Sequence, residues 1–289
     1  MARKKLLLIR GLGHSGTTIL DLALGSHPRM IGLGEALRIL RTPSPGEEQR
    51  GPARLRAELR HQRLCTCGTT AASCPIWGPL LDWLPVHDHL PLADKLRQLL
   101  GNVDHYVNQQ NGEIEWVVDS YQDDLQIPLQ VLPDLDVRII FLVRDVRSWV
   151  HSRARDGNKK GRSLPGVRSL VRWCWVNRRF ERDLTRSGKP IFLLGYEELA
   201  LSPERSLTLL CEWLGLPFAK AMLTPGVGTQ SHILAGNRLR FDPLKSREIS
   251  YNTSWLQGPA WPAQPALMLP SVDHLNRRLV YSNKVLGVD

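Results

Sequence analysis

A short apolar run that ends directly in a glycine-rich turn constrains the fold of this chain more than any other feature. Residues 5–10 read KLLLIR, and residues 11–18 read GLGHSGTT. The apolar run predicts a buried strand, and a helix is predicted from Thr17 to about Gly25. Such a turn directs backbone N–H groups and a helix N-terminus toward one point, which suits an anion. The sequence therefore predicts an α/β fold with an anion-binding loop after its first strand.

The spacing of Gly11 and Gly16 helps to indicate which kind of anion the loop binds. Gly11 and Gly16 have the spacing found in loops that hold nucleoside triphosphates, where Lys and then Ser or Thr follow the second glycine. Thr17 stands at the lysine position in this chain. The loop is therefore predicted to hold a different phosphate-like anion. The alternative is a plain turn between a strand and a helix.

Three further apolar stretches predict the rest of a sheet. They read EIEWVVDSY, DVRIIFLVRD and KPIFLLGYEEL, at residues 113–121, 136–145 and 189–199. Helical patterns separate them, and alternation of strands and helices is typical of a parallel sheet covered by helices. We expect one domain over residues 1–289, with a P-loop-like three-layer α/β fold and a central parallel sheet of four or five strands flanked by helices.

Segments rich in Gly, Pro and charge interrupt this pattern. Residues 42–63 and 156–164 are predicted to be mobile loops. Residues 224–289 lack a regular pattern until a predicted helix near 271–282. We expect this last third of the chain to cover the cofactor and the acceptor.

Charge and hydropathy restrict the partners and the compartment. The chain carries a formal net charge of +10, which favours anionic partners, although a basic solvated surface would give the same number. The apolar run near the N-terminus is too short for a signal peptide, and no stretch approaches the ~18 apolar residues of a membrane span. Five cysteines fit a reducing compartment. A cytoplasmic protein without a membrane span is predicted.

Basic and polar residues follow the ends of two other predicted elements. Arg144 ends a buried strand, and Ser152 lies eight residues later, in the helix that follows. Ligands of an open parallel sheet bind outside the carboxyl ends of its strands, and a guanidinium with a hydroxyl suits a phosphate. Arg144 could instead pair with Asp145 or with a helix. A weaker signal is the turn Gly236-Asn237 before Arg238, with Arg240 as an alternative contact.

Together these stretches resemble the sulfotransferase family that uses 3′-phosphoadenosine-5′-phosphosulfate (PAPS). GHSGTT, at residues 13–18, is similar to the family's 5′-phosphosulfate loop, and VRDVRSWVHS, at residues 143–152, to its 3′-phosphate motif. SHILAGNRLRF, at residues 231–241, is similar to the late cofactor loop of bacterial members. GLGEAL at residues 32–37 and CTCGTTAASCPIW at residues 65–77 also recur in a bacterial branch. The resemblance runs from residue 5 to about residue 241.

The resemblance implies a set of cofactor-binding residues. For the 5′-phosphosulfate it implies Gly13, His14, Ser15, Gly16, Thr17 and Thr18, and for the 3′-phosphate Arg144 and Ser152. Further cofactor contacts are implied for Tyr196, Gly236, Asn237 and Arg238, although an aromatic residue at a strand end is more often a packing residue. His14 stands where the family carries a lysine.

Three residues are candidates for the chemical step. A bound phosphosulfate would favour protonated His14, which could then stabilise the bridging oxygen as the sulfuryl group leaves. The resemblance favours Glu35 as the base that takes the proton of the acceptor, with Asp119 as the alternative. Related bacterial sequences often read D-S-S-K at the latter site, whereas this chain has Gln122 at the lysine position. Glu35 could otherwise be a helix-start carboxylate and Asp119 a strand-end cap.

Three cysteines near one another need a separate explanation. Cys65, Cys67 and Cys74 have the spacing C-x-C-x6-C, and His61 precedes them. Four such ligands could hold zinc, although C-x-C is less usual than C-x2-C. A disulfide such as Cys67–Cys74 and free packed thiols are the alternatives. No metal is predicted in the active site.

We therefore predict an enzyme that moves a sulfuryl group from PAPS to a hydroxyl or amine by in-line transfer with a carboxylate base, without a required metal. The acceptor could be a small molecule, a carbohydrate or a lipid-linked molecule. Nucleic acid is not expected as a partner. The rival predictions are a P-loop nucleotide-binding protein of kinase type and a basic nucleotide- or nucleic-acid-binding protein without transfer activity.

Overall fold

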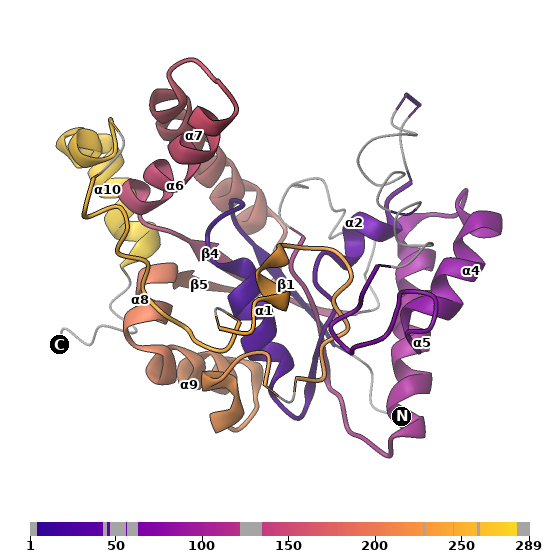
Figure 1. Cartoon of the computed structure of the whole chain (residues 1–289). Helices are drawn as coiled ribbons and strands as arrows, with labels where there is room; N and C mark the ends of the chain where they lie inside the picture. The colour runs from indigo at the N-terminus through magenta and orange to yellow at the C-terminus, as the bar shows by residue number, and fades with distance from the viewer. Residues whose placement is uncertain are drawn as a thin grey trace. The chain divides into compact units, whose positions relative to one another are not determined.

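A computed structural model of the chain describes residues 5–42, 45–46, 56, 63–121, 135–227, 229–244, 246–258 and 261–281. Figure 1 shows their helices and strands. The chain divides into two compact units. Unit 1 comprises residues 1–9, 18–138 and 224–248, and unit 2 comprises residues 10–17, 139–223 and 249–289.

Five parallel strands form the central sheet, in the order β2-β3-β1-β4-β5. The strands are β1 (Lys5–Arg10), β2 (Met30–Gly32), β3 (Trp116–Asp119), β4 (Asp136–Val143) and β5 (Ile191–Gly195). Nearly every side chain of β1, and the last five of β4, are buried, as expected for parallel strands covered on both faces. The predicted α/β fold with a parallel sheet flanked by helices is confirmed. The short strand β2 was not among the apolar stretches from which the sheet was predicted.

Unit 1 contains β1, β2 and β3 with most of the helices from the first half of the chain. These helices are α1 (Thr17–Gly25), α2 (Ala36–Leu40), α4 (Trp77–His87) and α5 (Leu92–Gln109), with a 3₁₀ helix η3 (Arg238–Phe241) from the later segment. β3 pairs with β1 on one side, Leu7 opposite Val118, and with β2 on the other, Ile31 opposite Val117. The sequence patterns did not predict α4, whose first residue Trp77 is fully buried.

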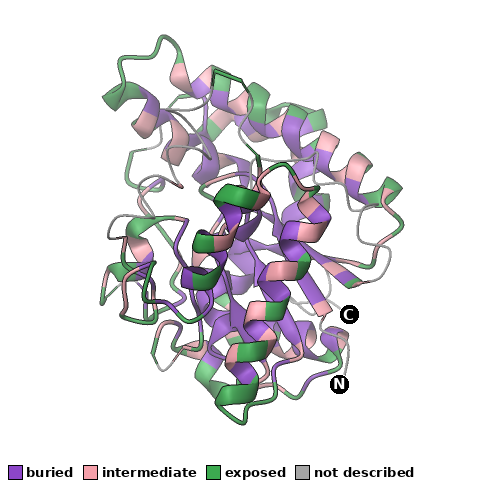
Figure 2. Cartoon of the chain, turned by 90° about the vertical axis from the view of Figure 1, so that its right-hand side faces the viewer, coloured by how far each residue is buried: buried purple, intermediate pink, exposed green. Residues whose placement is uncertain are grey.

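Unit 2 pairs β4 with β5 and covers them with helices. These are α6 (Val146–Lys159), α7 (Pro165–Arg186), α8 (Tyr196–Leu201), α9 (Pro203–Leu214) and α10 (Pro270–Val280), with the 3₁₀ helices η2 (Lys220–Leu223) and η4 (Gln264–Met268). Helices α6 and α7 lie side by side (Figure 1). Figure 2 shows that the helices bury one face and expose the other, as amphipathic helices over a sheet do.

Two of the predicted loop boundaries differ from the structure or fall outside it. Helix α6 continues to Lys159, so the first four residues of the predicted loop 156–164 are helical. Asp156 supports this last turn because it pairs with both Arg153 and Lys160. Most of the predicted loop 42–63, including His61, lies outside the described residues, as does Gln122. In the segment 224–289, α10 confirms the expected late helix. None of the described helices is both long enough and apolar enough for a membrane crossing.

Candidate active site

The loop between β1 and α1 is shaped by its second glycine. Gly16 has φ +91°, a conformation that side chains disfavour, and a Cβ atom there would lie 2.5 Å from the ring of Tyr196. The Tyr196 ring is therefore packed against the loop backbone, and its hydroxyl donates to the carbonyl of Ser250 at 2.9 Å. Tyr196 is buried, so the described structure places it beneath the loop as a support.

Other residues of the loop are held by backbone contacts. The Ser15 amide donates to the Leu12 carbonyl at 3.1 Å, and the Trp149 indole donates to the Gly13 carbonyl at 2.8 Å. Ser15 is buried, and α1 begins at Thr17 and continues through Thr18, as predicted. The N-terminus of α1 thus follows a fixed turn, which is the arrangement expected of an anion cradle.

His14 stands on this turn and contacts helix α6. Its φ is +74°, which is uncommon for a residue other than glycine. Arg153 Nη1 lies 2.9 Å from Nε2 of the imidazole, and Ser152 Oγ lies 3.4 Å from Nδ1. His14 and Ser152, which the sequence analysis assigned to different phosphates, therefore lie next to each other. Arg153, which the sequence analysis did not select, lies closer still.

The protein groups around His14 disfavour its charged form. Its pKa lies below 6.5, because the ring is partly desolvated and because Arg153, Arg144 and Lys160 repel a further positive charge. A guanidinium can only donate hydrogen bonds, so Nε2 accepts from Arg153 and carries no proton. The same basic residues that disfavour the imidazolium would favour a bound anion.

Arg144 connects the end of β4 to the loop. Its Nε donates to Ser148 Oγ at 2.9 Å, its Nη1 donates to the His14 carbonyl at 3.0 Å, and its guanidinium lies 4.8 Å from the centroid of the Tyr196 ring. Arg144 is buried and supports the loop directly. Of the two alternatives for Arg144, pairing with Asp145 is not observed, because Asp145 pairs with Arg147 instead. Contact with a helix is observed, at Ser148 of α6.

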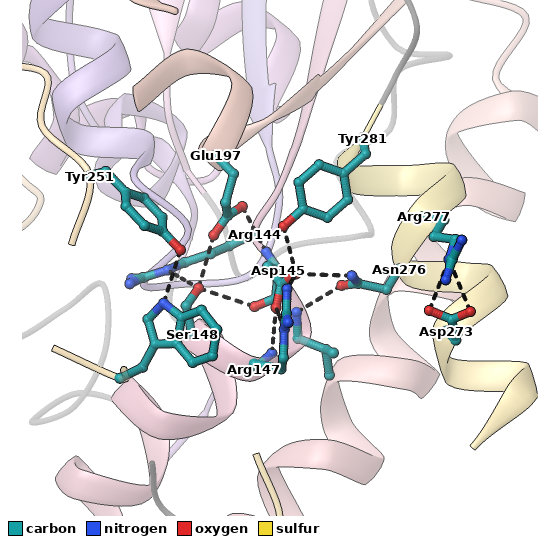
Figure 3. A network of polar contacts seen from close by, with 12 residues as sticks. Arg144, Asp145, Arg147, Ser148, Glu197, Tyr251, Asp273, Asn276, Arg277 and Tyr281 are labelled. Carbon is teal, nitrogen blue, oxygen red and sulfur yellow. Dashed lines mark hydrogen bonds and ion pairs between the residues drawn. The ribbon is translucent and has the colours of Figure 1, made fainter. Parts of the chain in front are cut away.

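A buried polar network surrounds these residues and was not predicted (Figure 3). Asp145 caps α6 and accepts hydrogen bonds from Arg147, Asn276 and Tyr281 at 2.8–3.0 Å. Although burial alone would raise it, the pKa of Asp145 lies below its usual range because these donors favour the carboxylate. The network orders the start of α6 and thereby the position of Arg144.

Glu197 completes the network from the first turn of α8. It accepts hydrogen bonds from the Asp145 amide and from Ser148 Oγ, both at 2.9 Å. Burial, together with the nearby charge of Asp145, raises the pKa of Glu197 to about 7. Glu197, Asn276 and Tyr281 are each more than 50 residues from Asp145 in the sequence. No local sequence pattern could therefore have linked them to it.

The two candidate bases lie at the start of α2, in unit 1. Glu35 is the residue before the helix, and its carboxylate pairs with Arg38 at 2.7 Å. Asp119, at the end of β3, accepts hydrogen bonds from the amides of Leu37 at 2.8 Å and Tyr121 at 3.2 Å. The side chain of Glu35 is 14% exposed, whereas Asp119 is 2% exposed. Asp119 therefore serves as a cap for α2, and Glu35 is the more accessible of the two carboxylates.

A third carboxylate in unit 1 was not selected from the sequence. Asp21, on α1, is fully buried and accepts a hydrogen bond from Ser120 Oγ at 2.5 Å. Burial raises its pKa to about 7, and the neighbouring Asp119 and Glu35 contribute to the rise. Ser120 follows Asp119 directly, so this pair lies beside the capped end of β3.

The late loop is organised by Arg240. Its guanidinium donates to the carbonyls of Leu234, Gly236 and Asn237 at 2.8–2.9 Å. Burial, followed by the repulsion of other charges, lowers the pKa of Arg240 to about 10. The loop starts beside Glu35, whose amide donates to the Ala235 carbonyl at 3.1 Å.

Arg238 differs from Arg240 in being exposed. The side chain of Asn237 accepts from the Leu239 amide at 3.0 Å and so fixes the turn from which Arg238 projects. Of the two arginines, Arg240 holds the loop together. Arg238 is the one whose charge is accessible to a ligand.

The fold defines an α/β protein with a P-loop-like turn after β1. The chain belongs to the Sulfotransferase family, whose profile matches residues 7–220, about three quarters of its length. No curated protein matches the sequence significantly.

Two solved structures share the fold. The first is the sulfotransferase domain from the olefin synthase of Synechococcus PCC 7002, with a TM-score of 0.52 and 19% identity over 98% of each chain. The second is the sulfotransferase domain from the curacin biosynthetic pathway, with a TM-score of 0.51 and 17% identity over 97% of this chain and 99% of that one. At these identities the likeness concerns the fold.

Proposed function

We propose that the chain transfers a sulfuryl group from PAPS to a hydroxyl or amine of an acceptor and releases adenosine 3′,5′-bisphosphate. The observation that carries the proposal is that arginine side chains contact the glycine loop in a chain of the Sulfotransferase family. Arg144 and Arg153 contact the loop at His14, and their charges lie where an anion would be stabilised. The net charge of +10 points the same way.

In this proposal the loop binds the 5′-phosphosulfate. Residues Gly13 to Thr18 supply backbone N–H groups, hydroxyls and the start of α1, which together suit a compact anion. Thr17 occupies the position of a triphosphate-binding lysine, which fits a ligand with one phosphate joined to a sulfuryl group. Tyr196 supports Gly16 from below.

The 3′-phosphate is assigned to Arg144 and Ser152, with Arg153 as an addition that the geometry supports. Ser152 and Arg153 are adjacent on α6, and both approach His14. The exposed Arg238, after Gly236 and Asn237, is assigned to the same nucleotide. A 3′-phosphate distinguishes PAPS from ATP and ADP, so these contacts would set nucleotide preference.

The transfer step moves one sulfuryl group and one proton. The acceptor oxygen or nitrogen forms a bond to sulfur, the bond from sulfur to the bridging oxygen breaks, and its electron pair remains on the 5′-phosphate. Glu35 takes the acceptor proton, a role that Asp119 fits less well because its oxygens are engaged by backbone amides. His14 and the basic residues around it stabilise the charge that develops on the leaving phosphate.

The acceptor is assigned by chemistry alone: a nucleophilic hydroxyl or amine on a small molecule, a carbohydrate or a lipid-linked molecule. The two related domains come from an olefin synthase and from the curacin pathway. Their fold supports the donor chemistry.

The first experiment compares nucleotides by calorimetric titration of the full chain. We expect adenosine 3′,5′-bisphosphate to bind, with ADP and ATP–magnesium binding at least about tenfold more weakly. Preference for ATP–magnesium would favour the kinase-type rival. Binding of nucleic acid with a steep dependence on salt, without nucleotide preference, would favour the binding-protein rival. Turnover of labelled PAPS then tests transfer.

One matched pair of variants locates the nucleotide. Ser152→Ala removes a hydroxyl beside His14, and we expect it to weaken bisphosphate binding by about tenfold. Lys159→Ala removes an exposed charge from the same helix and is the control. Equal affinities for the two variants would remove Ser152 from the site. Arg144→Ala is less informative, because Arg144 also holds the loop.

A further inference from the structure

Three cysteines and one histidine of unit 1 gather at one point outside the proposed active-site residues. The thiols of Cys65, Cys67 and Cys74 and a ring nitrogen of His232 all lie within 4.8 Å of one another. Cys74 Sγ is 3.2 Å from Nδ1 of His232. None of the three thiols forms a disulfide. His61, which the sequence analysis considered as a fourth ligand, lies outside the described residues, and His232 is the fourth group of the cluster that the structure describes.

A tight turn presents the first two thiols. The Cys65 amide donates to the Thr69 carbonyl at 2.8 Å, and the Gly68 amide donates back to the Cys65 carbonyl at 3.0 Å. Gly68 follows Cys67 with φ +88°, which lets the chain reverse directly after the second thiol. Cys65 and Cys67 therefore stand on one turn whose backbone is already satisfied.

Cys74 and His232 are held in place by separate contacts. The Cys74 carbonyl accepts from the Gly78 amide at 2.8 Å, which ties it to the first turn of α4. The His232 amide donates to the Gly32 carbonyl at 2.7 Å, and its carbonyl accepts from the Trp77 indole at 2.5 Å. The imidazole packs edge-on against Tyr106, with ring centroids 4.8 Å apart. Its Nδ1 is thereby directed at the thiols.

Thr66 joins the two segments that carry these ligands. Its hydroxyl donates to the Ser231 carbonyl at 2.7 Å and accepts from the Ile233 amide at 2.8 Å. The residue between Cys65 and Cys67 is therefore bonded to both neighbours of His232. These hydrogen bonds align the segment near residue 66 with the segment near residue 232.

We infer that Cys65, Cys67, Cys74 and His232 bind one zinc ion. Ligand atoms at about 2.0–2.3 Å from zinc in a tetrahedron lie about 3.5–3.8 Å from one another, so only small side-chain movements are needed to close the site. Thiolates and an imidazole are the donors that zinc prefers over hard cations. Cys65, Cys74 and His232 are buried, as expected for an enclosed site, and Cys67 is the least buried of the four.

Four protein ligands leave no position for a substrate, so the zinc is structural. It ties His232, and with it the start of the loop that continues to Gly236 and Arg238, to the turn before α4. The ion takes no part in the proposed transfer step. The assignment does not depend on the proposed function.

Metal analysis of the full chain tests the inference. The chain, expressed with added zinc and purified under reducing conditions, is expected to contain about one zinc per molecule by elemental analysis and by native mass spectrometry. Replacement by cobalt should produce a near-ultraviolet sulfur-to-cobalt absorption band. A folded chain with less than about a tenth of an equivalent of zinc would overturn the assignment. Mapping of a Cys67–Cys74 disulfide in that protein would overturn it as well.

Variants distinguish a built site from adventitious binding. Cys67→Ser changes the least buried ligand and is expected to lower zinc affinity, measured by competition with a chromophoric chelator, by at least about tenfold. Cys174→Ser changes a thiol on α7 and should retain wild-type affinity. Chelation should lower the melting temperature of wild type and Cys174→Ser, and should lower that of Cys67→Ser by less. Equal zinc affinity in both variants would refute the inference.

Discussion

A histidine stands at position 14 in a backbone conformation that usually belongs to glycine. The same residue receives a hydrogen bond from Arg153 and has its pKa lowered by desolvation and by the surrounding cations. Backbone strain of this kind costs about 1–3 kcal/mol and persists when its surroundings fix it. The Arg144 contact to the His14 carbonyl is one such constraint.

Substitution of His14 by lysine should change how nucleotide binding depends on pH. An anion raises the pKa of the imidazole, so wild type takes up a proton on binding and should bind more tightly as the pH falls toward the lowered His14 pKa. Lysine stays charged over this range, so His14→Lys should lack this component. Calorimetry of both proteins with adenosine 3′,5′-bisphosphate at several pH values gives their affinity ratio. Because the ligand's own titration cancels in that ratio, a ratio independent of pH would exclude His14 as a titrating contact.

The second glycine of the loop permits a separate test. Gly16→Ala adds a methyl group 2.5 Å from the Tyr196 ring at a residue with φ +91°. Gly161→Ala has the same kind of φ, +63°, but open space around it, so it measures the backbone cost alone. We expect the free energy of unfolding in urea to fall by about 1 kcal/mol for Gly161→Ala, and clearly more for Gly16→Ala. Equal decreases in the free energy of unfolding would mean that the Tyr196 ring moves away from the added methyl group without an energetic cost.

Among the elements, α2 shows how one helix start separates two similar carboxylates. Asp119 reaches the first turn from β3 and accepts the amide of Leu37. Glu35 precedes the helix in sequence but makes no capping hydrogen bond and pairs with Arg38 instead. The Asp119 carboxylate therefore stabilises the start of α2, whereas the Glu35 carboxylate can be approached by a ligand.

These two carboxylates should respond differently to removal of their charge. Glu35→Gln is expected to lower turnover by about 100- to 10,000-fold and to leave nucleotide affinity unchanged. Asp119→Asn can still accept the Leu37 amide but loses its second acceptor oxygen, so we expect about 1 kcal/mol less stability and a much smaller loss of turnover. Rates with labelled PAPS and urea titrations check both. The reverse pattern, with turnover lost only in Asp119→Asn, would identify Asp119 as the catalytic base.

At the scale of the whole molecule, among the residues that the structure describes, each compact unit contains a buried carboxyl group whose pKa is raised to about 7. Asp21 lies in unit 1 and Glu197 in unit 2. In both cases burial is the main cause. The folded state therefore binds these two protons more tightly than the unfolded state does.

Stability should consequently fall as the pH rises. Because both folded-state pKa values are raised, their stabilising contribution is complete below about pH 4 and is lost as the pH rises through about 7. Asp145 opposes this at lower pH, since its lowered pKa makes stability fall as acid protonates it. We expect Glu197→Gln to flatten the decline in the free energy of unfolding between pH 4.5 and about 7. Urea titrations across that range measure it, and an unchanged slope would show that Glu197 is ionised in the native state.

Local patterns in the sequence were enough for most of the fold. The strands near residues 5, 116, 140 and 193 were predicted because buried parallel strands read as continuous apolar runs. Helix α4 was missed, since the cysteine-rich stretch before it and Pro85 within it conceal the helical period. The end of α6 was placed too early because its last turn contains Gly157, which Asp156 offsets by pairing with neighbouring basic residues.

For the candidate site, the sequence indicated which residues to consider, and the structure describes what each one contacts. Ser152 lies 3.4 Å from the His14 ring, a contact between two motifs that the sequence analysis assigned to different phosphates. Arg153, Glu197 and Asp21 were not found, because their significance depends on partners far away in the chain or on burial. His232 is separated from Cys74 by 158 residues, so spacing alone could not indicate it as the fourth ligand.

The sequence by itself determined four of the five strands and the glycine turn before α1, because period and backbone preference act over a few residues. Only the tertiary structure decided which partner each charged side chain contacts, and so which of several similar side chains supports the fold. It assigned Asp119 to a helix cap, Arg240 to backbone carbonyls and Arg147 to Asp145. Pairing and burial depend on which distant segments meet, and the free energy of a charged group depends on both.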